Sequence, residues 1–204
     1  MTVDRDPVSS KAKWNLRHEQ REMPGPACRV LRAHRDLLPA NGLALDLACG
    51  LGGNAILLAQ AGLKCEAMDI SDVAVSRLNT FAGRENLAIS ACLADVEAHG
   101  FSLAPKQYDV IVVSYFLHRP LFPAIVSALK LGGLLFYQTF VQNDAGAQSG
   151  PKTLSFYLRE RELLSQFRDL EIRYYDERAN DNGGKASFEA ELVAQKTNAI
   201  VSLG

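Results

Sequence analysis

A regular alternation of strand and helix patterns between residues 43 and 141 constrains the fold more than any other feature of the sequence. Short apolar runs bounded by glycine, proline or polar residues indicate strands, and the stretches between them have the spacing of helices. The predicted strands cover residues 43–47, 64–69, 87–93, 110–113 and 134–141. The predicted helices cover residues 54–61, 71–81 and 120–130. This order is typical of an α/β fold in which helices cover both faces of a parallel sheet.

Serine and glycine residues mark where the predicted helices begin and end. Ser71 is expected to cap the helix that follows it, because a serine hydroxyl accepts a hydrogen bond from a free backbone N–H group. Gly62 and Gly83 are expected to end the first two helices, since glycine readily adopts the left-handed conformation found at helix ends. The Gly132-Gly133 pair is expected to end the third helix.

The last third of the chain has a different pattern. A polar loop at 142–152 precedes a predicted helix at 159–167, and two strand patterns follow at 170–177 and 187–196. The sequence Asn-Asp-Asn-Gly-Gly at 180–184 is typical of a β-hairpin turn. With the five earlier strands, this predicts a Rossmann-like, doubly wound sheet of seven strands, mostly parallel with one terminal antiparallel strand.

Residues 1–40 precede this alternation and are expected to form an N-terminal helical cap on a domain that covers 41–204. Within this segment, residues 27–38 have the pattern of one amphipathic helix. Trp14 lies in a charged stretch with Arg17. The two side chains either fold over a ligand as a lid or pack at the solvent edge of the domain.

The charge balance argues against a nucleic-acid-binding protein. The chain has 22 Lys and Arg residues against 23 Asp and Glu residues, a net charge of −1, and no polybasic segment. It is 48% apolar, has no apolar run long enough to cross a bilayer, and shows no signal-peptide pattern at its N-terminus. We therefore expect a compact cytoplasmic protein that acts on a small molecule, and not on nucleic acid or at a membrane.

The four cysteines lack the spacing of a disulfide framework or a metal site. Cys28, Cys49, Cys65 and Cys92 lie mostly within apolar segments. They are expected to be reduced, buried side chains, and no bound metal is expected.

The segment Leu45 to Asn54, LDLACGLGGN, points most directly to a function. A strand that runs through a glycine-rich turn into a helix lets a ligand approach the backbone and bind free N–H groups at the helix start. In an open α/β sheet this turn lies at the carboxyl edge of the strands, where ligands bind. Two classes of cofactor use such a turn.

One interpretation is a nicotinamide-dependent oxidoreductase. Residues 50–55 fit the pattern G-x-G-x-x-G/A, and Asp69 lies at the distance along the chain expected for a ribose ligand. Asp46 argues against this interpretation, because a carboxylate at this position would repel a pyrophosphate. It favours a cofactor that is cationic and carries no phosphate.

With this acid, the sequence resembles the class I S-adenosylmethionine-dependent methyltransferases. In that family an acid and a glycine-rich turn border the methionine part of the cofactor, a second acid binds the ribose, and an Asp after the third strand reaches the adenine. Asp46, Asp69 and Asp95 stand at these places. The resemblance implies cofactor contacts at Asp46, Ala48, Gly50, Gly52, Asn54, Asp69, Ile70, Asp95, Val96 and Ser114. Ala48 is a departure, because the family often has its first glycine there.

The resemblance covers residues 43–196 and is closest to the tellurite-resistance branch, whose members methylate small thiols and oxyanions of heavy chalcogens. Similar segments lie at 52–59, 150–163 and 174–177. That branch often has an arginine after the second motif glycine, and Gly53 occupies this position here.

Candidate residues for the acceptor follow the fourth strand. Tyr115, His118 and Arg119 are the predicted catalytic residues. An imidazole titrates near neutral pH, and a guanidinium can bind an oxyanion. Their structural alternatives are a loop histidine and an arginine that neutralises the acidic edge of the sheet. Tyr157, in the late loop, is a candidate for the roof of the acceptor pocket. The histidines that are expected to have no part in the site are His18, His34 and His99.

The function implied is transfer of the methyl group of S-adenosylmethionine to a small molecule by in-line displacement. The expected acceptor is a soft nucleophile, a thiol or a chalcogen oxyanion, which needs little help from a base. Three alternatives stay open at this point: a nicotinamide-dependent oxidoreductase, methylation of a protein or RNA, and a cofactor-binding protein without turnover.

Overall fold

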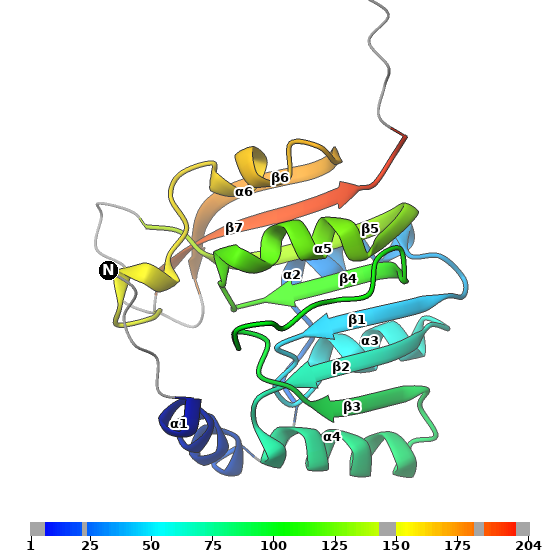
Figure 1. The fold of residues 1–204 in the computed structure, drawn as a ribbon, viewed down its shortest axis with the longest axis vertical. Helices are drawn as coiled ribbons and strands as arrows, with labels where there is room; N and C mark the ends of the chain where they lie inside the picture. Colours follow the sequence, from blue (N-terminus) through cyan, green and yellow to red (C-terminus); the bar gives the residue numbers. More distant parts are fainter. Residues whose placement is uncertain (1–6, 22–23, 143–149, 182–185, 199–204) are drawn as a thin grey trace, which may run out of the picture.

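The computed structural model describes residues 7–21, 24–142, 150–181 and 186–198. Seven strands form one sheet in the order β3-β2-β1-β4-β5-β7-β6 (Figure 1). Strands β1 to β5 pair in parallel, and β7 is antiparallel to both of its neighbours, β5 and β6. The predicted fold is therefore confirmed. The antiparallel strand, the last along the chain, lies inside the sheet, and β6 forms the edge.

The first three strands alternate with two helices, as predicted. They are β1 (Leu43–Leu47), α3 (Gly53–Gln60), β2 (Lys64–Asp69), α4 (Asp72–Arg84) and β3 (Ile89–Leu93). The hydroxyl of Ser71 caps α4 by accepting a hydrogen bond from the Ala74 N–H at 3.1 Å. Gly62 follows α3 with a positive φ of 101°. Gly83 does not end α4, because the N–H of Glu85 still bonds to the carbonyl of residue 81.

The connection from β4 to β5 continues this pattern with one correction. Its elements are β4 (Tyr108–Ser114), the 3₁₀ helix η2 (Arg119–Leu121), α5 (Phe122–Ala128) and β5 (Leu129–Phe140), with η marking 3₁₀ helices. The prediction that Gly132-Gly133 ends a helix near residue 130 is wrong, because both glycines lie within β5. The pairing of β5 with β4 shifts register here, and Gly132 has a φ of 81°. The glycines therefore accommodate an irregular strand.

The described residues of the last third form a 3₁₀ helix, a short α-helix and two long strands. The elements are η3 (Leu154–Phe156), α6 (Glu162–Gln166), β6 (Glu171–Asp181) and β7 (Ala186–Gln195). Both predicted strands are confirmed, and the helix predicted at 159–167 is shorter than expected. Most of the turn predicted at 180–184, and most of the polar loop at 142–152, lies outside the described residues.

The N-terminal segment forms α1 (Pro7–Glu19), α2 (Arg29–Ala33) and η1 (Arg35–Leu37). The single helix predicted over 27–38 is wrong, because the backbone leaves helical geometry at His34 (φ −119°, ψ 31°). Figure 1 shows α1 beside α4, at the side of the molecule toward which β1 to β4 point. This places α1 at the carboxyl edge of the sheet, near the predicted site.

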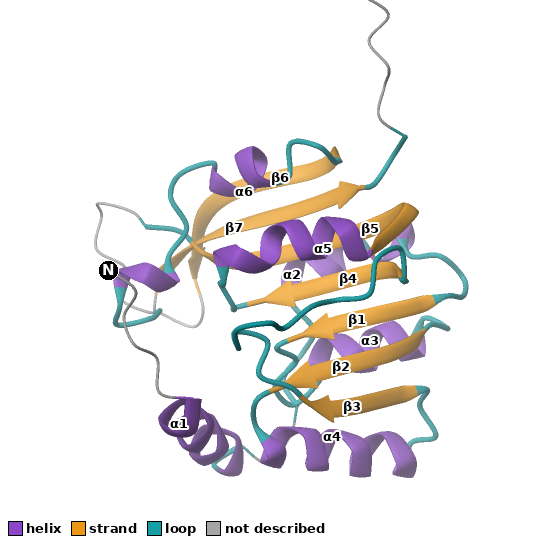
Figure 2. Ribbon diagram, viewed as in Figure 1, coloured by secondary structure: helices purple, strands orange, loops and turns teal. Residues whose placement is uncertain are grey.

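Helices cover both faces of the sheet (Figure 2), and an apolar cluster of side chains lies on each face. On one face Leu58 of α3 and Leu78 of α4 pack in a cluster with the strands and α2. On the other face Phe122 of α5 and Phe167 pack against Tyr137 of β5. Each such buried side chain stabilises the fold by about 1.5–3 kcal/mol.

The cysteines follow their prediction with one exception. Cys28, Cys49 and Cys65 are buried thiols, whereas Cys92 is exposed on the edge strand β3. In the described part of the chain, no group of three or more His, Cys, Asp or Glu residues could hold a metal ion. The helices described there include none that is both long and apolar enough to span a membrane.

Candidate active site

The glycine-rich turn between β1 and α3 has a left-handed backbone at three positions. The φ angle is 56° at Ala48, 52° at Gly50 and 83° at Gly52. Gly52 is the N-cap of α3, and a Cβ there would overlap the side chain of Leu78 on α4. Ala48 adopts this conformation despite its Cβ, which costs about 1–2 kcal/mol. The backbone therefore explains why a glycine is common at this position among the methyltransferases that the sequence resembles.

Asp46 lies near the carboxyl end of β1 and is completely buried. Its carboxylate accepts hydrogen bonds from the Ala55 N–H at 3.0 Å and from Asn54 Nδ2 at 3.2 Å. Burial raises the pKa of Asp46 to about 7, because it disfavours the charged form more than the two hydrogen bonds stabilise it. Asn54 Nδ2 also donates to Ser114 Oγ at the end of β4 (2.9 Å). Three predicted cofactor residues, Asp46, Asn54 and Ser114, thus form one hydrogen-bonded chain across β1, α3 and β4, called the Asp46 chain below.

Asp69, the last residue of β2, joins the two neighbouring turns. Its carboxylate accepts hydrogen bonds from the N–H groups of Gly50 at 2.7 Å and Ser71 at 2.8 Å. The residue is 7% exposed. Asp69 therefore holds the glycine-rich turn against the start of α4.

The remaining predicted cofactor residues follow β2 and β3. Ile70 is half-buried after β2, and Val96 is buried after β3. Asp95 is half-buried, and its Oδ1 accepts a hydrogen bond from the Glu97 N–H at 3.1 Å. The fold thus brings these residues to the same edge of the sheet as Asp46 and Asp69.

Helix α1 places His18 at this edge, although the sequence predicts no part in the site for this histidine. Its ring lies over the turn, with Cε1 at 3.2 Å from the position that a Cβ on Gly50 would take. His18 is 5% exposed, stacks on Trp14 at 5.9 Å between ring centroids, and has a buried Nδ1 without a hydrogen-bond partner. Burial lowers its pKa. The spacing of Trp14 and His18, four residues apart on one helix face, is the pattern that could have identified it.

Two further hydrogen bonds hold α1 on this edge. Ser71 Oγ donates to Asn15 Oδ1 at 2.6 Å, and the carbonyl of His18 accepts from Arg77 on α4 at 2.7 Å. Arg17 lies over the ring of Trp14, 5.2 Å from its centroid. Trp14 therefore packs against both Arg17 and His18.

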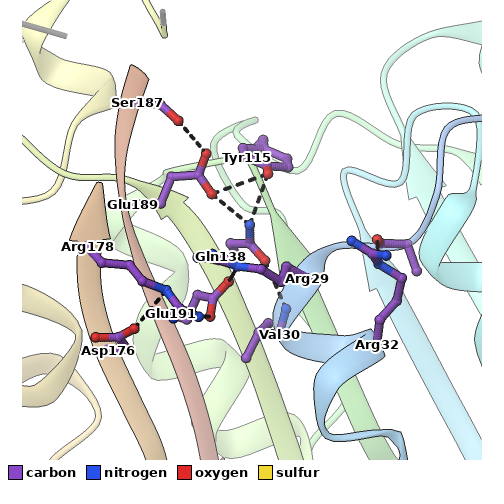
Figure 3. A network of polar contacts seen from close by, with 11 residues as sticks. Arg29, Val30, Arg32, Tyr115, Gln138, Asp176, Arg178, Ser187, Glu189 and Glu191 are labelled. Atoms are coloured by element: carbon purple, nitrogen blue, oxygen red, sulfur yellow. Dashed lines mark hydrogen bonds and ion pairs between the residues drawn. The ribbon is translucent and has the colours of Figure 1, made fainter. Parts of the chain in front are cut away.

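Tyr115 follows β4 directly and also has a left-handed backbone, with a φ of 53°. Its hydroxyl accepts a hydrogen bond from Gln138 Nε2 at 2.9 Å and lies 3.3 Å from Glu189 Oε2 (Figure 3). Gln138 and Glu189 are completely buried. The Tyr115 ring also packs against Phe140, and Phe140 against Tyr157, with centroids 5.3 and 6.0 Å apart. An aromatic row thus lies beside the Asp46 chain.

A second buried carboxylate lies two residues further along β7. Glu191 is 1% exposed and forms an ion pair with Arg29 of α2. Arg178 Nη2 approaches the same carboxylate at 3.4 Å and its Nε pairs with Asp176 at 2.8 Å (Figure 3). The opposite charges make this group a cross-link between α2, β7 and β6.

A comparison with protein families matches residues 12–186 to the family model described as "Tellurite resistance protein TehB". The chain belongs to the TehB family. It is 30% identical over 167 residues to a Haemophilus influenzae protein named "Probable S-adenosyl-L-methionine-dependent methyltransferase TehB". The match covers 74% of this chain and 56% of that protein. The chain thus spans little more than half the length of the curated relative.

Solved structures confirm the fold of this TehB-family chain. The crystal structure of TehB from Haemophilus influenzae superposes with a TM-score of 0.70 at 24% identity, covering 92% of this chain and 67% of that chain. The [4+2]-cyclase SpnF superposes with a TM-score of 0.67 at 18% identity, covering 82% and 78% of the two chains. Since a protein named for a different reaction shares the fold, the reaction has to be argued from the site.

One departure of this chain from the TehB branch has a structural reason. Gly53, where that branch often has an arginine, is the first residue of α3. A Cβ there would overlap the backbone carbonyl of Gly25 and approach that of Pro26. Close packing of the N-terminal segment against α3 therefore requires glycine at this position.

The other two predicted catalytic residues of this TehB-family chain point to neighbouring loops. Arg119 donates to both carboxylate oxygens of Glu162, at 2.6 and 2.8 Å, and to the carbonyls of Ser155 and Tyr157. His118 Nδ1 lies 3.9 Å from a carboxylate oxygen of Glu97. The structure thus brings Tyr115 next to the Asp46 chain, whereas Arg119 fastens the loop before α6.

Proposed function

We propose that this chain transfers the methyl group of S-adenosylmethionine to a small-molecule acceptor. The observation that carries the proposal is the buried carboxylate of Asp46, whose partners Asn54 and Ala55 N–H are both neutral. A cationic ligand at this carboxylate would supply the missing opposite charge. A pyrophosphate would add a further negative charge.

The residues of the site fit this cofactor. The position that a Cβ on Gly50 would take is bordered by the His18 ring, and His18 Nδ1 is a buried polar atom that lacks a partner. We assign the methionine part to Asp46, Ala48, Gly50, Gly52, Asn54 and Ser114, the ribose to Asp69 and Ile70, and the adenine to Asp95 and Val96. His18 and Trp14 would cover the cofactor from α1, so residues 1–40 act as a cap on the domain at 41–204.

When bound, S-adenosylmethionine supplies a methyl group that is activated by its sulfonium charge. The chain has to hold an acceptor in line with that methyl group and to exclude water. Asp46 and Asn54 would fix the methionine part, and the aromatic row of Tyr115, Phe140 and Tyr157 would shield the acceptor side. Such a site suits a soft nucleophile, for which desolvation and alignment matter more than a strong base.

Titration calorimetry with S-adenosylhomocysteine tests the cofactor half of the proposal. We expect saturable binding by wild type and at least about tenfold weaker binding by Asp69→Ala, which removes the assigned ribose ligand and a bond to the turn. The matched control is Asp36→Ala, in η1, which is not part of the site. Absence of binding at millimolar ligand would refute the proposal.

A thermal-shift screen separates the alternatives. Stabilisation by NAD or NADP and none by S-adenosylhomocysteine would favour an oxidoreductase. Binding without turnover on thiols, chalcogen oxyanions, phenols, amines, RNA or protein would favour a non-catalytic role. A cytoplasmic location also belongs to the proposal, and cell fractionation tests it.

A further inference from the structure

Tyr115, Gln138 and Glu189 lie beside the proposed acceptor site, and the donor and the acceptor of each hydrogen bond among them can be assigned. The Val30 N–H donates to Gln138 Oε1 at 3.0 Å, which directs Gln138 Nε2 toward Tyr115 and Glu189. Because Nε2 is a donor, the Tyr115 hydroxyl oxygen accepts its hydrogen. The hydroxyl's own proton is then directed to Glu189 Oε2, 3.3 Å away (Figure 3).

The group lies next to the assigned methionine end of the cofactor site. The Cys28 N–H donates to Asn54 Oδ1, and the Val30 N–H donates to Gln138. Since two residues of chain span at most about 7 Å, the same short segment ties Gln138 to the Asp46 chain. Tyr115 also follows Ser114, which ends that chain.

Only one member of the trio is open to a ligand. Tyr115 is 45% exposed, whereas Gln138 and Glu189 are completely buried. Among the described residues, the charged and titratable groups that face Tyr115 are Glu189 of β7, Cys28 and Arg29. Burial, together with Glu189, raises the pKa of Tyr115 above its ordinary value. The tyrosine therefore keeps its proton unless it passes that proton to Glu189.

We propose that Tyr115 takes the proton of a thiol acceptor and passes its own hydroxyl proton to Glu189. This inference rests on the proposed methyltransferase function. The acceptor sulfur forms a bond to the methyl carbon while the bond from that carbon to the cofactor's sulfur breaks, with its electron pair going to that sulfur. The S–H proton moves to Tyr115 Oη, and the hydroxyl proton of Tyr115 moves to the Glu189 carboxylate. The products are a methyl thioether, a neutral cofactor product and protonated Glu189, which returns its proton to water.

This arrangement selects between the two soft acceptors. A protonated thiol has a proton to transfer and arrives without charge. A chalcogen oxyanion would bring negative charge toward Glu189, which is held in place by Gln138 and by Ser187 Oγ at 2.8 Å. The acceptor class is therefore a neutral thiol, with an apolar part that fits the aromatic row.

The transfer of a proton from the thiol to Tyr115 and from Tyr115 to Glu189, called the relay below, can be tested with two thiols of different pKa. An alkyl thiol, with a pKa near the ordinary ~8.5 of a cysteine thiol or above, is mostly protonated at pH 7 and needs the relay, whereas an acidic aryl thiol is already ionised. Wild type should use the aryl thiol less well than a neutral thiol, because the thiolate meets the same repulsion from Glu189 as an oxyanion. Glu189→Gln and Tyr115→Phe should each lower kcat/KM about 100-fold for the alkyl thiol, whereas neither should lower it more than about fivefold for the aryl thiol. The pH profile for the alkyl thiol should then follow thiol ionisation in both variants.

The matched control is Glu191→Gln, a buried carboxylate on the same strand that pairs with Arg29 and makes no bond to Tyr115. It should leave the ratio of the two kcat/KM values unchanged. Tyr115→Phe keeps the bond between Gln138 and Glu189, so it carries the test if Glu189→Gln does not fold.

Equal losses for the two thiols in Tyr115→Phe would overturn the relay, because a structural role affects both acceptors alike. A wild-type protein that binds S-adenosylhomocysteine but methylates neither thiol would overturn the acceptor class and the relay together. A wild-type protein that does not bind S-adenosylhomocysteine would refute the proposed function itself.

Discussion

Replacement of Asp46 by Asn should change stability and cofactor affinity in opposite directions. Asp46 is completely buried, and burial raises its pKa from the ordinary 3.8 to about 7. Because the pKa is higher in the folded state than in the unfolded chain, this group lowers the free energy of unfolding as pH rises from about 4 to about 7. One pKa unit corresponds to about 1.4 kcal/mol, so the loss above pH 7 is about 4 kcal/mol.

The Asn variant escapes this loss because it does not ionise. It also gives up the hydrogen bond that Asn54 donates to the protonated carboxyl, which is worth about 0.5–1.5 kcal/mol to a neutral acceptor. At pH 8 the variant should therefore be about 3 kcal/mol more stable than wild type. Between pH 8 and pH 5 its advantage should shrink by about 2–3 kcal/mol, so that the two proteins are nearly equal in stability at pH 5. Urea denaturation at pH 8 and pH 5 measures both values.

Cofactor affinity should respond in the opposite sense. A bound cation favours ionised Asp46, so wild-type binding below pH 7 has to displace a proton. The Kd for S-adenosylhomocysteine, which keeps an ammonium group, should rise about tenfold for each pH unit below 7. Asp46→Asn should bind more weakly at pH 8, with little dependence on pH. Calorimetry at pH 5.5, 6.5, 7.5 and 8.5 measures the slope.

Two results together would refute this reasoning. They are an Asp46→Asn protein that is less stable than wild type at pH 8, and a wild-type Kd that stays constant from pH 5.5 to 8.5. The first would mean that the buried carboxylate does not destabilise the apoprotein. The second would mean that the cofactor's charge does not act on Asp46.

Three further substitutions test separate parts of the site. Gly52→Ala, at a φ of 83° and against Leu78, should lower the free energy of unfolding by about 2–4 kcal/mol in urea denaturation. His18→Ala should weaken the binding of S-adenosylhomocysteine about tenfold in calorimetry. It should change Tm little, because a buried Nδ1 without a partner contributes little to the stability of the apoprotein. Unchanged affinity would mean that His18 is not part of the site. Arg119→Ala leaves the carboxylate of Glu162 without its partner and should cost about 1–3 kcal/mol in unfolding while cofactor affinity stays the same; lost methyl transfer at unchanged stability would instead assign Arg119 to the acceptor.

The sequence could predict which residues meet in the proposed cofactor half of the site, because most of them are close in sequence. β1, the glycine-rich turn and α3 form one continuous segment, and β2 has the bounds that its strand pattern predicts. Strand-helix periodicity and backbone preferences of glycine act over a few residues, so they can be recognised without knowledge of the fold. The Gly132-Gly133 pair shows the limit of such rules, since the same dipeptide can end a helix or accommodate an irregular strand.

The residues of the proposed acceptor half come together only in the tertiary structure. Glu189 is 51 residues from Gln138 and 74 from Tyr115 along the chain. The strand pattern around it does not distinguish it from the other acidic residues of that strand. His18 likewise reaches Gly50 only because α1 packs beside α4. The sequence by itself determined the alternating sheet and the acidic, glycine-rich edge, because those depend on local backbone preference. The order of strands in the sheet decided which buried carboxylate faces the Tyr115 hydroxyl, because packing brings together residues that are far apart along the chain.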